Sequence, residues 1–443
     1  MDYVLHFALT HTAFRLPELL AVCECLAIDI RLPAEEEERA VHRPFLVVKL
    51  ESDEEARRLA SRCILVKSIM QLPVEIRMAV YALWAQGSTY EELHAANRRS
   101  RDVWSKYENS SFRFTVSAVN HTTRKERIRN RPYADTGRER YDGDGNFRHV
   151  YFGRLISEGA SRPLIGKFDV KKRVFFGNTS MDAEMSLLMA NQAQAAPGKF
   201  IYDPFAGTGS MLYTAAHFGA FVFGSDMDGR QMRGKDKTPG IYRASAQYGV
   251  SSRLMDCATF DVTHNPWRCG DIFDAIVTDP PYGVRAGAKR LGGKAQRAPL
   301  RDEPTVLEDG MLAHMKPTYV PPMRPYELSD LAHDLVHFAR YFLKPGGRLV
   351  FFLPTVTDEY KDVDIPVCEG MTIVANSLQD FGKWGRRLIT MVKTAEGEVE
   401  APRFDGSGRR ASTEPESAAG SSSSPAHYNF RVKYFSGFRP GPP

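Results

Sequence analysis

The sequence predicts an α/β protein, with a doubly wound sheet in its second half and a smaller α+β region before it. From residue 200 onward, short apolar runs alternate with amphipathic segments, as strands and covering helices do in a parallel sheet. Two of these apolar runs end in polar turn motifs, at the edge where such sheets bind ligands. With 443 residues, the chain is also too long for one compact core.

The first part of the chain alternates strand and helix patterns over a short distance. Residues 3–9 and 45–50 are apolar enough for strands, and residues 16–26 carry apolar side chains at helical spacing. A second helix is predicted to begin at the acidic stretch 52–55. Bulky and polar residues alternate over 112–116 and predict a further strand. These elements predict a small α+β module.

The second half carries the pattern of a doubly wound sheet. Residues 329–343 form an amphipathic helix pattern, and Gly346-Gly347 is expected to stop that helix. The cofactor site of such a sheet is expected at the carboxyl ends of its strands. The strands expected in this sheet are residues 200–202, 221–226, 273–278, 349–353 and 388–392.

The first turn motif, Asp203-Pro204-Phe205-Ala206-Gly207-Thr208-Gly209, contains a Gly-x-Gly loop after a predicted strand. Its glycines let the backbone turn tightly and approach a ligand closely. No lysine follows the loop, so it lacks the cation of a phosphate-binding NTPase loop. Asp226 ends the next predicted strand, where a carboxylate can accept hydrogen bonds from ribose hydroxyls. This motif predicts a nucleoside cofactor, and on this motif alone NAD remains an alternative.

The second turn motif, Asp279-Pro280-Pro281-Tyr282-Gly283, also follows an apolar run. An exocyclic aromatic amine is a weak nucleophile, because its lone pair is delocalised into the ring. Hydrogen bonds from the amine to the Asp279 carboxylate and the Pro280 carbonyl would orient that lone pair and stabilise the charge developing on nitrogen. The prolines stiffen the backbone, and Tyr282 can stack on the target base. Together the motifs predict S-adenosyl-L-methionine-dependent methylation of an exocyclic amine.

The predicted cofactor contacts follow from this assignment. Asp203 is expected to bind the ammonium of the methionine part, Asp226 the ribose, and Asp261 the adenine amino group. The cofactor site expected from the strand ends comprises Asp203, Phe205, Gly207, Gly209, Asp226, Asp261 and Val262.

Basic side chains gather in two clusters before the sheet, and aromatic residues lie among and beside them. Interleaved basic and aromatic residues suit phosphate contacts and base stacking. The alternative for the first cluster is a helix with a solvated arginine face, and the net charge of +5 permits a nucleic-acid partner without requiring one. The amine-binding motif downstream favours RNA. The residues expected to contact it are Arg127, Arg129, Arg131, Lys171, Lys172 and Arg173.

Several classes of protein are disfavoured. Six cysteines are scattered without Cys-x-x-Cys spacing, so neither a zinc site within the chain nor a disulfide framework is expected. The first residues lack a secretory signal pattern, and no segment approaches the ~20 apolar residues that cross a bilayer. We therefore expect a cytoplasmic protein that has no membrane partner.

The composition suggests three parts. Residues 1–170 form the predicted RNA-binding region, and residues 171–402 form the catalytic domain, with a Gly-, Pro- and Lys-rich insertion at 284–325. Residues 403–443 form a tail whose stretch 403–426 is rich in Ser, Gly and Pro and is expected to be disordered. The aromatic residues from 427 to 438 are expected to dock back on the body.

The chain resembles the eukaryotic tRNA guanosine-10 N2-methyltransferase catalytic subunits. The most specific stretches are residues 177–184 and 203–210, and the resemblance extends to Leu5-His6-Phe7-Ala8, 153–156, 279–285 and 384–388. It implies an N-terminal THUMP-containing tRNA-binding half, a class I methyltransferase half and formation of N2-methylguanosine. It also implies a small zinc-binding activator subunit, shared among several methyltransferases, as a partner.

The resemblance adds two site residues and leaves some alternatives open. Thr179 and Ser180 match the family's pattern and could line the cofactor or base pocket, although Thr179-x-x-Asp182 is also a helix-capping signature. Adenine N6 and a protein glutamine amide remain alternative target amines. A tRNA-binding protein with a non-catalytic second half is the alternative from another class.

Overall fold

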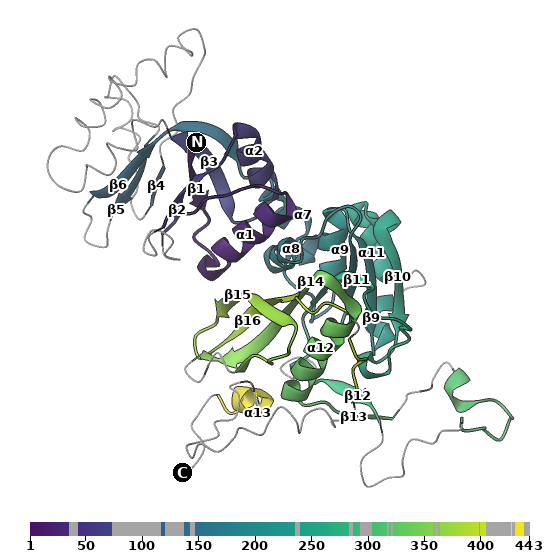
Figure 1. The fold of residues 1–443 in the computed structure, drawn as a ribbon. Coiled ribbons are helices and arrows are strands. Elements are labelled where there is room, and N and C mark those ends of the chain that lie inside the picture. The colour runs from purple at the N-terminus through teal and green to yellow at the C-terminus, as the bar shows by residue number, and fades with distance from the viewer. Residues whose placement is uncertain are drawn as a thin grey trace, which may run out of the picture. The chain divides into compact units, whose positions relative to one another are not determined.

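The computed structural model divides the chain after Pro163 into two compact units, Met1–Pro163 and Leu164–Pro443. This division lies near the boundary predicted after residue 170. The structure describes residues 1–34, 43–72, 117–119, 137–141, 147–234, 240–282, 287–292, 304–316, 319, 322–357, 360, 364–397, 399–404, 427 and 430–437 (Figure 1).

The first unit contains a four-stranded antiparallel sheet in the order β2-β1-β3-β7, and helices α1 (Arg15–Cys25) and α2 (Asp53–Arg62). Its strands are β1 (Asp2–Phe7), β2 (Phe45–Lys49), β3 (Val66–Leu72) and β7 (Arg154–Glu158). The predicted strands 3–9 and 45–50 and both predicted helices are thereby confirmed. A separate three-stranded sheet contains β4 (Ser117–Val119), β5 (Gly137–Tyr141) and β6 (Phe147–Phe152). The strand predicted at 112–116 lies outside the described residues.

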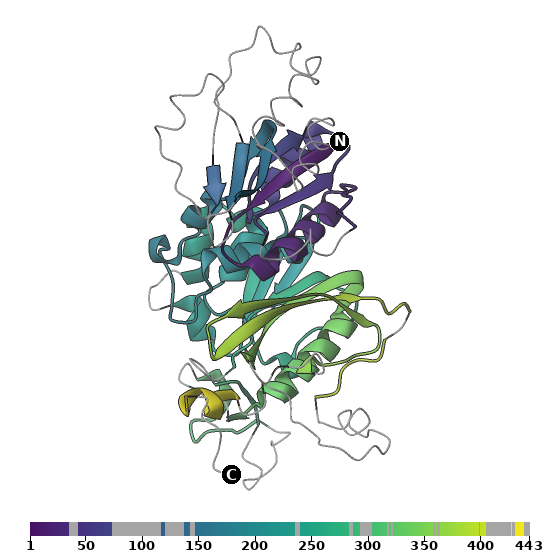
Figure 2. The ribbon, with the colours of Figure 1, turned by 90° about the vertical axis from the view of Figure 1, so that its left-hand side faces the viewer.

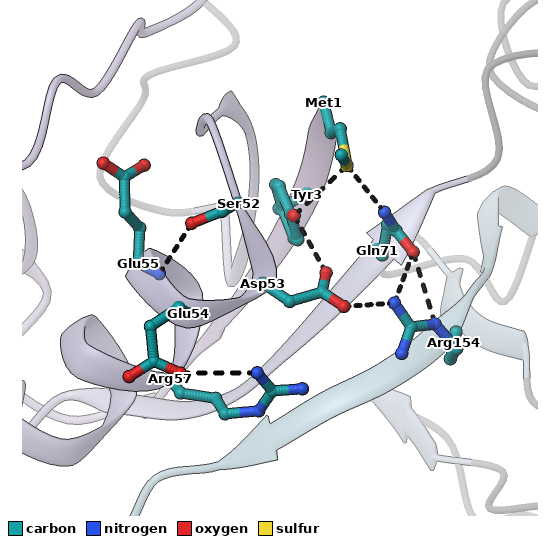
Figure 3. Close-up of polar contacts among 9 residues, drawn as sticks. All are labelled: Met1, Tyr3, Ser52, Asp53, Glu54, Glu55, Arg57, Gln71 and Arg154. Atoms are coloured by element: carbon teal, nitrogen blue, oxygen red, sulfur yellow. Dashed lines mark hydrogen bonds and ion pairs between the residues drawn. The ribbon is translucent and has the colours of Figure 1, made fainter.

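A polar cluster joins four elements of the first unit (Figure 3). The Tyr3 hydroxyl of β1 donates to Asp53 Oδ1 at the start of α2 at 2.9 Å, and the Arg154 guanidinium of β7 pairs with Asp53 Oδ2. Arg154 also donates to Gln71 of β3 at 2.8 Å. Burial opposes ionisation of Asp53, but the hydrogen bonds from Arg154 and Tyr3 outweigh it and hold the carboxyl pKa below its usual value. The cluster therefore fixes α2 against the sheet.

The second unit is built on a seven-stranded sheet in the order β10-β9-β8-β11-β14-β16-β15. Neighbours from β10 to β14 are parallel, whereas β16 is antiparallel to both β14 and β15. The strands are β8 (Phe200–Asp203), β9 (Phe221–Asp226), β10 (Leu254–Thr259), β11 (Phe273–Thr278), β14 (Leu343–Val356), β15 (Met371–Asp380) and β16 (Trp384–Lys393). This is the doubly wound sheet that the sequence predicts.

Helices cover both faces of this sheet (Figures 1 and 2). On one face, Phe338 and Phe342 of α12 pack in a buried core that contains Tyr202, Phe273 and Leu349. The opposite face carries α8 and α9, and a side chain at Gly224 would meet Leu212 of α9. The helices of the unit are α7 (Pro163–Lys167), α8 (Ala183–Gln192), α9 (Ser210–His217), α10 (Gly229–Arg233), α11 (Gly240–Tyr248), α12 (Leu328–Phe342) and α13 (Phe430–Phe435). The short 3₁₀ turns are η1 (Thr12–Phe14) in the first unit, and η3 (Val170–Lys172), η4 (Ser251–Arg253), η5 (Val262–His264) and η6 (Ala313–Met315) in the second.

The end of α12 differs from the prediction. Gly346-Gly347 does not stop the helix, because α12 already ends at Phe342 and β14 begins at the next residue. Leu343 is fully buried and pairs with Phe273 of β11, which requires extended backbone there. Gly346 has a φ of +76° and lies where the register between β11 and β14 shifts. The glycines therefore form an irregularity within the strand.

Two predictions concern the segments outside the sheet. In the predicted insertion at 284–325, β12 (Lys289–Leu291) pairs antiparallel with β13 (Met323–Pro325). Of the stretch expected to be disordered, residues 405–426 lie outside the described part of the chain. The aromatic end does dock on the body, since the Phe430 side chain of α13 is only 2% exposed.

Candidate active site

The loop after β8 has the tight shape that its glycines predict. Gly207 and Gly209 have φ angles of +51° and +83°, which side chains rarely allow, and Gly209 is the N-cap of α9. A β-carbon at Gly209 would come within 2.8 Å of the Tyr213 hydroxyl, which itself donates to the Thr208 carbonyl. Only glycine therefore fits at this point of the turn.

Asp226, at the end of β9, holds this loop. The Gly207 backbone N–H donates to Asp226 Oδ2 at 2.9 Å, and the Asp228 N–H donates to Oδ1 at 2.8 Å. Burial raises the pKa of the Asp226 carboxyl above its usual value, while these two hydrogen bonds lower it in part. The predicted ribose-binding carboxylate thus lies directly beside the glycine loop.

Asp203 is connected to the strand that carries the second motif. Its fully buried carboxylate accepts hydrogen bonds at Oδ1 from the Thr278 hydroxyl, at 2.7 Å, and from the Phe205 backbone, at 3.0 Å. Thr278 is the last residue of β11 and immediately precedes Asp279. The structure therefore brings the two motifs together at the carboxyl ends of neighbouring strands.

The second oxygen of Asp203 lacks a protein contact. Within the described part of the chain, buried Oδ2 has no hydrogen-bond partner. Burial raises the pKa of Asp203 to about 7, and although Thr278 and the Phe205 N–H lower it, the charges of Asp226 and Asp279 raise it further. A buried carboxyl with a perturbed pKa and an unsatisfied oxygen is suited to a cationic ligand group.

The second motif begins where β11 ends. Asp279 is 19% exposed at its side chain, Pro280 is buried, and Tyr282 is half-buried. The Tyr282 ring packs edge-on against Phe430 of α13, with ring centroids 6.4 Å apart. Gly283, the last residue of the motif, lies outside the described residues.

Arg386 of β16 is a site residue that the sequence reasoning missed. Its Nη1 lies 3.4 Å from Asp279 Oδ2, and its Nε donates to Gln379 Oε1 at 2.7 Å. The guanidinium stacks 4.1 Å from the Phe352 ring centroid and lies 3.8 Å from Asp182. The stretch Trp384 to Leu388 supported the family resemblance, but nothing in its spacing connected it to Asp279.

Thr179 and Ser180 lie at the glycine loop. The Ser180 hydroxyl shares a hydrogen bond with the Thr208 hydroxyl at 2.6 Å, and a β-carbon at Gly207 would lie 3.8 Å from Thr179 Oγ1. The alternative capping role of Thr179 is not seen. Asp182 caps α8 instead, accepting from the Met185 N–H at 2.9 Å, because α8 begins only at Ala183.

Asp261 follows β10, as expected, and is 3% exposed. Its Oδ1 accepts from the Thr263 N–H at 2.9 Å, and its Oδ2 accepts from the Leu291 N–H of β12 at 2.6 Å. The carboxylate therefore anchors β12 beside the site. Val262 is buried next to it in η5.

The predicted RNA contacts have different placements. Lys171 and Lys172 are exposed in η3, as phosphate contact requires. Arg173 is 3% exposed, donates to the Tyr248 and Ser210 hydroxyls at 3.1 and 2.8 Å, and lies over the Tyr213 ring. Its guanidinium is therefore packed between α9 and α11 and is not available to RNA in this conformation. Arg127, Arg129 and Arg131 lie outside the described residues.

The described residues offer neither a metal cluster nor a membrane-spanning helix. Among them, no group of three or more His, Cys, Asp or Glu side chains could hold a metal ion. Within the same ranges, no helix is both long and apolar enough to cross a membrane.

Comparison with known proteins assigns both units. Residues 1–131 match the family described as Tmrp11 THUMP N-terminal domain, and residues 171–320 match the RMKL-like methyltransferase domain. A tRNA (guanine(10)-N(2))-methyltransferase of Schizosaccharomyces pombe is 34% identical, over 98% of this chain and 96% of that protein. The chain belongs to the tRNA (guanine(10)-N(2))-methyltransferase family. Membership of this family identifies the seven-stranded sheet as that of a class I methyltransferase, in which antiparallel β16 lies between β14 and β15.

Other members of the tRNA (guanine(10)-N(2))-methyltransferase family match over similar lengths. The Saccharomyces cerevisiae protein of that name is 32% identical over 98% of this chain and 99% of its own length. The Homo sapiens protein, tRNA (guanine(10)-N(2))-methyltransferase TRMT11, is 32% identical over 89% of this chain and 89% of its own length. The predicted family and the predicted enzyme class are confirmed.

Proposed function

We propose that this chain transfers a methyl group from S-adenosyl-L-methionine to the exocyclic N2 amine of guanosine 10 in tRNA. The Thr278–Asp203 hydrogen bond carries this proposal, because it places the glycine loop and the Asp279 turn side by side at one sheet edge. The similarity to relatives named tRNA (guanine(10)-N(2))-methyltransferases supports the choice of substrate.

The residues at the glycine loop fit this cofactor. Asp203 Oδ2, buried and without a partner in the described residues, would accept a hydrogen bond from the methionine ammonium. Asp226 would accept from the ribose hydroxyls, and Gly207 and Gly209 leave the backbone open to close approach. When bound, S-adenosyl-L-methionine would supply an electrophilic methyl group on a positively charged sulfur, which the amine nitrogen takes as it gives up one proton.

The turn after β11 would act on the amine. Asp279 would accept a hydrogen bond from one amine proton and the Pro280 carbonyl from the other, directing the nitrogen lone pair towards the methyl group. The Asp279 charge also stabilises the positive charge that develops on nitrogen. Tyr282 would stack on the guanine, which must first be extruded if it lies in a duplex.

We further propose that the first unit binds tRNA, and that Lys171 and Lys172, which belong to the second unit, also contact tRNA phosphates. A small zinc-binding activator subunit is the proposed partner, on the family resemblance alone. A cytoplasmic location is proposed because the six cysteines lack the spacing of a disulfide framework.

The test is methyl transfer from labelled S-adenosyl-L-methionine to unmodified tRNA carrying either guanosine or adenosine at position 10, with and without the small subunit. Transfer that requires guanosine supports the proposal, and dependence on the added subunit supports the partner. Transfer that persists with adenosine moves the target elsewhere, with adenine N6 as the first alternative. Loss of all transfer to tRNA, with cofactor binding intact, would favour a glutamine substrate or a non-catalytic tRNA-binding protein.

A further inference from the structure

The turn between β15 and β16 lies at the same end of the sheet as the candidate active site, where the parallel strands β11 and β14 have their carboxyl ends. Trp384, the first residue of β16, pairs with Val356, the last residue of β14, whose parallel neighbour β11 ends near Asp279. The Thr357 hydroxyl donates to the Gly382 carbonyl at 3.0 Å. The turn is therefore held at this edge by hydrogen bonding to the end of β14.

Aromatic side chains gather at this turn and on the neighbouring helix α13, and two of them, Phe381 and Phe435, are exposed. Phe381 is 48% exposed, and its ring lies 4.6 Å from that of Trp384. Trp384 in turn packs edge-on against Tyr434 of α13 at 5.5 Å, and Phe435 of the same helix is 66% exposed. Figures 1 and 2 place α13 beside the ends of β15 and β16. We call this cluster the aromatic platform; it comprises the exposed Phe381 and Phe435, the half-buried Trp384 and Tyr434, and the buried Phe430 beneath them.

Phe430 connects the aromatic platform to the catalytic turn. Its ring, 2% exposed, lies 5.8 Å from that of Trp384 and 6.4 Å from that of Tyr282. Aromatic rings thus continue from the residue proposed to stack on the target base to rings at the surface. This row of rings brings the exposed aromatic side chains of the turn into the same region as Tyr282, and each exposed ring offers a face on which one base can stack.

We propose that the aromatic platform stacks on nucleobases of the tRNA substrate next to the extruded target guanosine. This inference rests on the proposed function. Extruding one base exposes the faces of its neighbours, and an aromatic side chain can cover a face of any base. Large exposed aromatic residues without such a ligand would lose the hydrophobic stabilisation of burial.

The charges around the aromatic platform favour RNA over a protein partner. Lys383 is exposed in the turn, and Lys433 lies half-buried on α13, so cations flank the rings where phosphates would run. Asp380 is also exposed there, but its Oδ1 accepts a hydrogen bond from the Gly382 N–H at 2.8 Å and serves the turn itself. Docking of a protein partner on the same rings is the competing outcome.

The test measures binding of fluorescein-labelled unmodified tRNA by the full chain, for Phe381→Ala, Phe435→Ala and a control. Phe221→Ala is the matched control, because Phe221 is similarly exposed, at 41%, but lies at the amino end of β9 and thus at the opposite sheet edge. We expect Phe381→Ala to weaken tRNA affinity about fivefold or more, the lower limit for stacking one base. Phe381→Trp should stay within about twofold, since a ring is kept.

Several readouts separate the possible outcomes. Affinity for S-adenosyl-L-methionine should not change in any of the variants, so that the loss is one of tRNA binding alone. Equal tRNA affinity for Phe381→Ala, Phe435→Ala and Phe221→Ala would overturn the inference. Loss of a protein partner with tRNA affinity intact would also overturn it. Methylation by the unaltered chain is measured alongside: its failure counts against the proposed function, whereas normal methylation with unaffected platform variants counts only against the platform.

Discussion

Arg386 Nη1 lies 3.4 Å from Asp279 Oδ2 and thereby ties the antiparallel end of the sheet to the turn after β11. The same guanidinium is fixed by Gln379 and by the Phe352 ring, so its position is set by three strands. A carboxylate held in this way keeps its orientation and its charge beside a reacting amine. Arg386 is therefore expected to position Asp279 without touching the substrate.

Replacement of Arg386 should slow catalysis more than it weakens binding. For Arg386→Gln we expect kcat for methyl transfer to fall about tenfold to a hundredfold, because a loosened Asp279 no longer directs the amine. The dissociation constants for tRNA and for S-adenosyl-L-methionine should stay within about threefold. Steady-state kinetics with saturating substrates measures kcat, single-turnover kinetics shows whether the methyl-transfer step itself is slowed, and equilibrium binding gives the dissociation constants.

Arg387→Gln is the matched control for that variant. Arg387 is the next residue of β16, but its guanidinium contacts Asn376 at 3.2 Å and lies over the Tyr360 ring. Adjacent strand residues face opposite sides of a sheet, so this arginine is removed without disturbing Asp279. Similar losses of kcat in both variants would mean that Arg386 serves only to stabilise the fold.

Cofactor affinity should depend on pH through Asp203. Its pKa of about 7 means that the carboxyl is mostly neutral at pH 6, whereas binding the methionine ammonium requires the ionised form. We expect the dissociation constant for S-adenosyl-L-methionine to rise about fivefold between pH 7 and pH 6. Titration calorimetry in two buffers should also detect proton release on binding at pH 6.

Asp203→Asn separates this effect from other titrations. The variant should bind the cofactor more weakly at pH 7 and lose most of the dependence between pH 6 and pH 7. The stability of the cofactor-free fold should depend on pH in the opposite direction from cofactor affinity, being higher at low pH. A raised carboxyl pKa stabilises the fold below about pH 4, and this stability is lost as pH rises through about 7. An unchanged pH profile in Asp203→Asn would contradict the assigned role.

The lysines of η3 should contribute to tRNA affinity by binding phosphates. Lys171→Glu combined with Lys172→Glu is expected to weaken tRNA binding. It should also reduce the salt dependence of binding, by about one unit of logarithmic slope for each phosphate that is no longer neutralised. The same change at Arg127, Arg129 and Arg131 tests the first basic cluster. The measurement is the tRNA binding constant between about 50 and about 200 mM salt. An unchanged slope of its logarithm against the logarithm of salt concentration would mean that these side chains are only solvated.

The docking of α13 should depend on Phe430. Loss of a buried phenylalanine removes about 3–5 kcal/mol, more than a six-residue helix can otherwise supply. Phe430→Ala should therefore release α13, and amide hydrogens of residues 430–437 should exchange faster while the sheet stays protected. Val432→Ala is the control, since Val432 is 67% exposed on the same helix. Equal exchange in the two variants would argue that Phe430 does not anchor α13.

The sequence predicts those strands of the sheet that are marked by a continuous apolar run within a few neighbouring residues. The expected strands 221–226 and 273–278 coincide with β9 and β11, because continuous apolar runs between turns are typical of buried parallel strands. Both turn motifs directly follow predicted strands. The placement of Asp203, Asp226 and Asp279 at one edge could therefore be predicted.

Contacts between distant residues could not be predicted in this way. Arg386 reaches Asp279 across 107 residues, and only the antiparallel insertion of β16 brings them together. Arg173 has the same charge as Lys171 and Lys172 but turns inward, where its guanidinium lies over the Tyr213 ring and donates to the Tyr248 and Ser210 hydroxyls. A run of basic residues gives no sign of which member is buried.

The central claim is that the two turn motifs form one methyl-transfer site with Asp279 at the amine, and Asp279→Ala tests it most directly. Methyl transfer to guanosine 10 is followed in a single turnover, with affinities for tRNA and S-adenosyl-L-methionine measured on the same preparation. We expect turnover to be abolished while tRNA affinity stays within a few-fold, because Asp279 acts on the reacting nitrogen. Full turnover by Asp279→Ala would contradict the account.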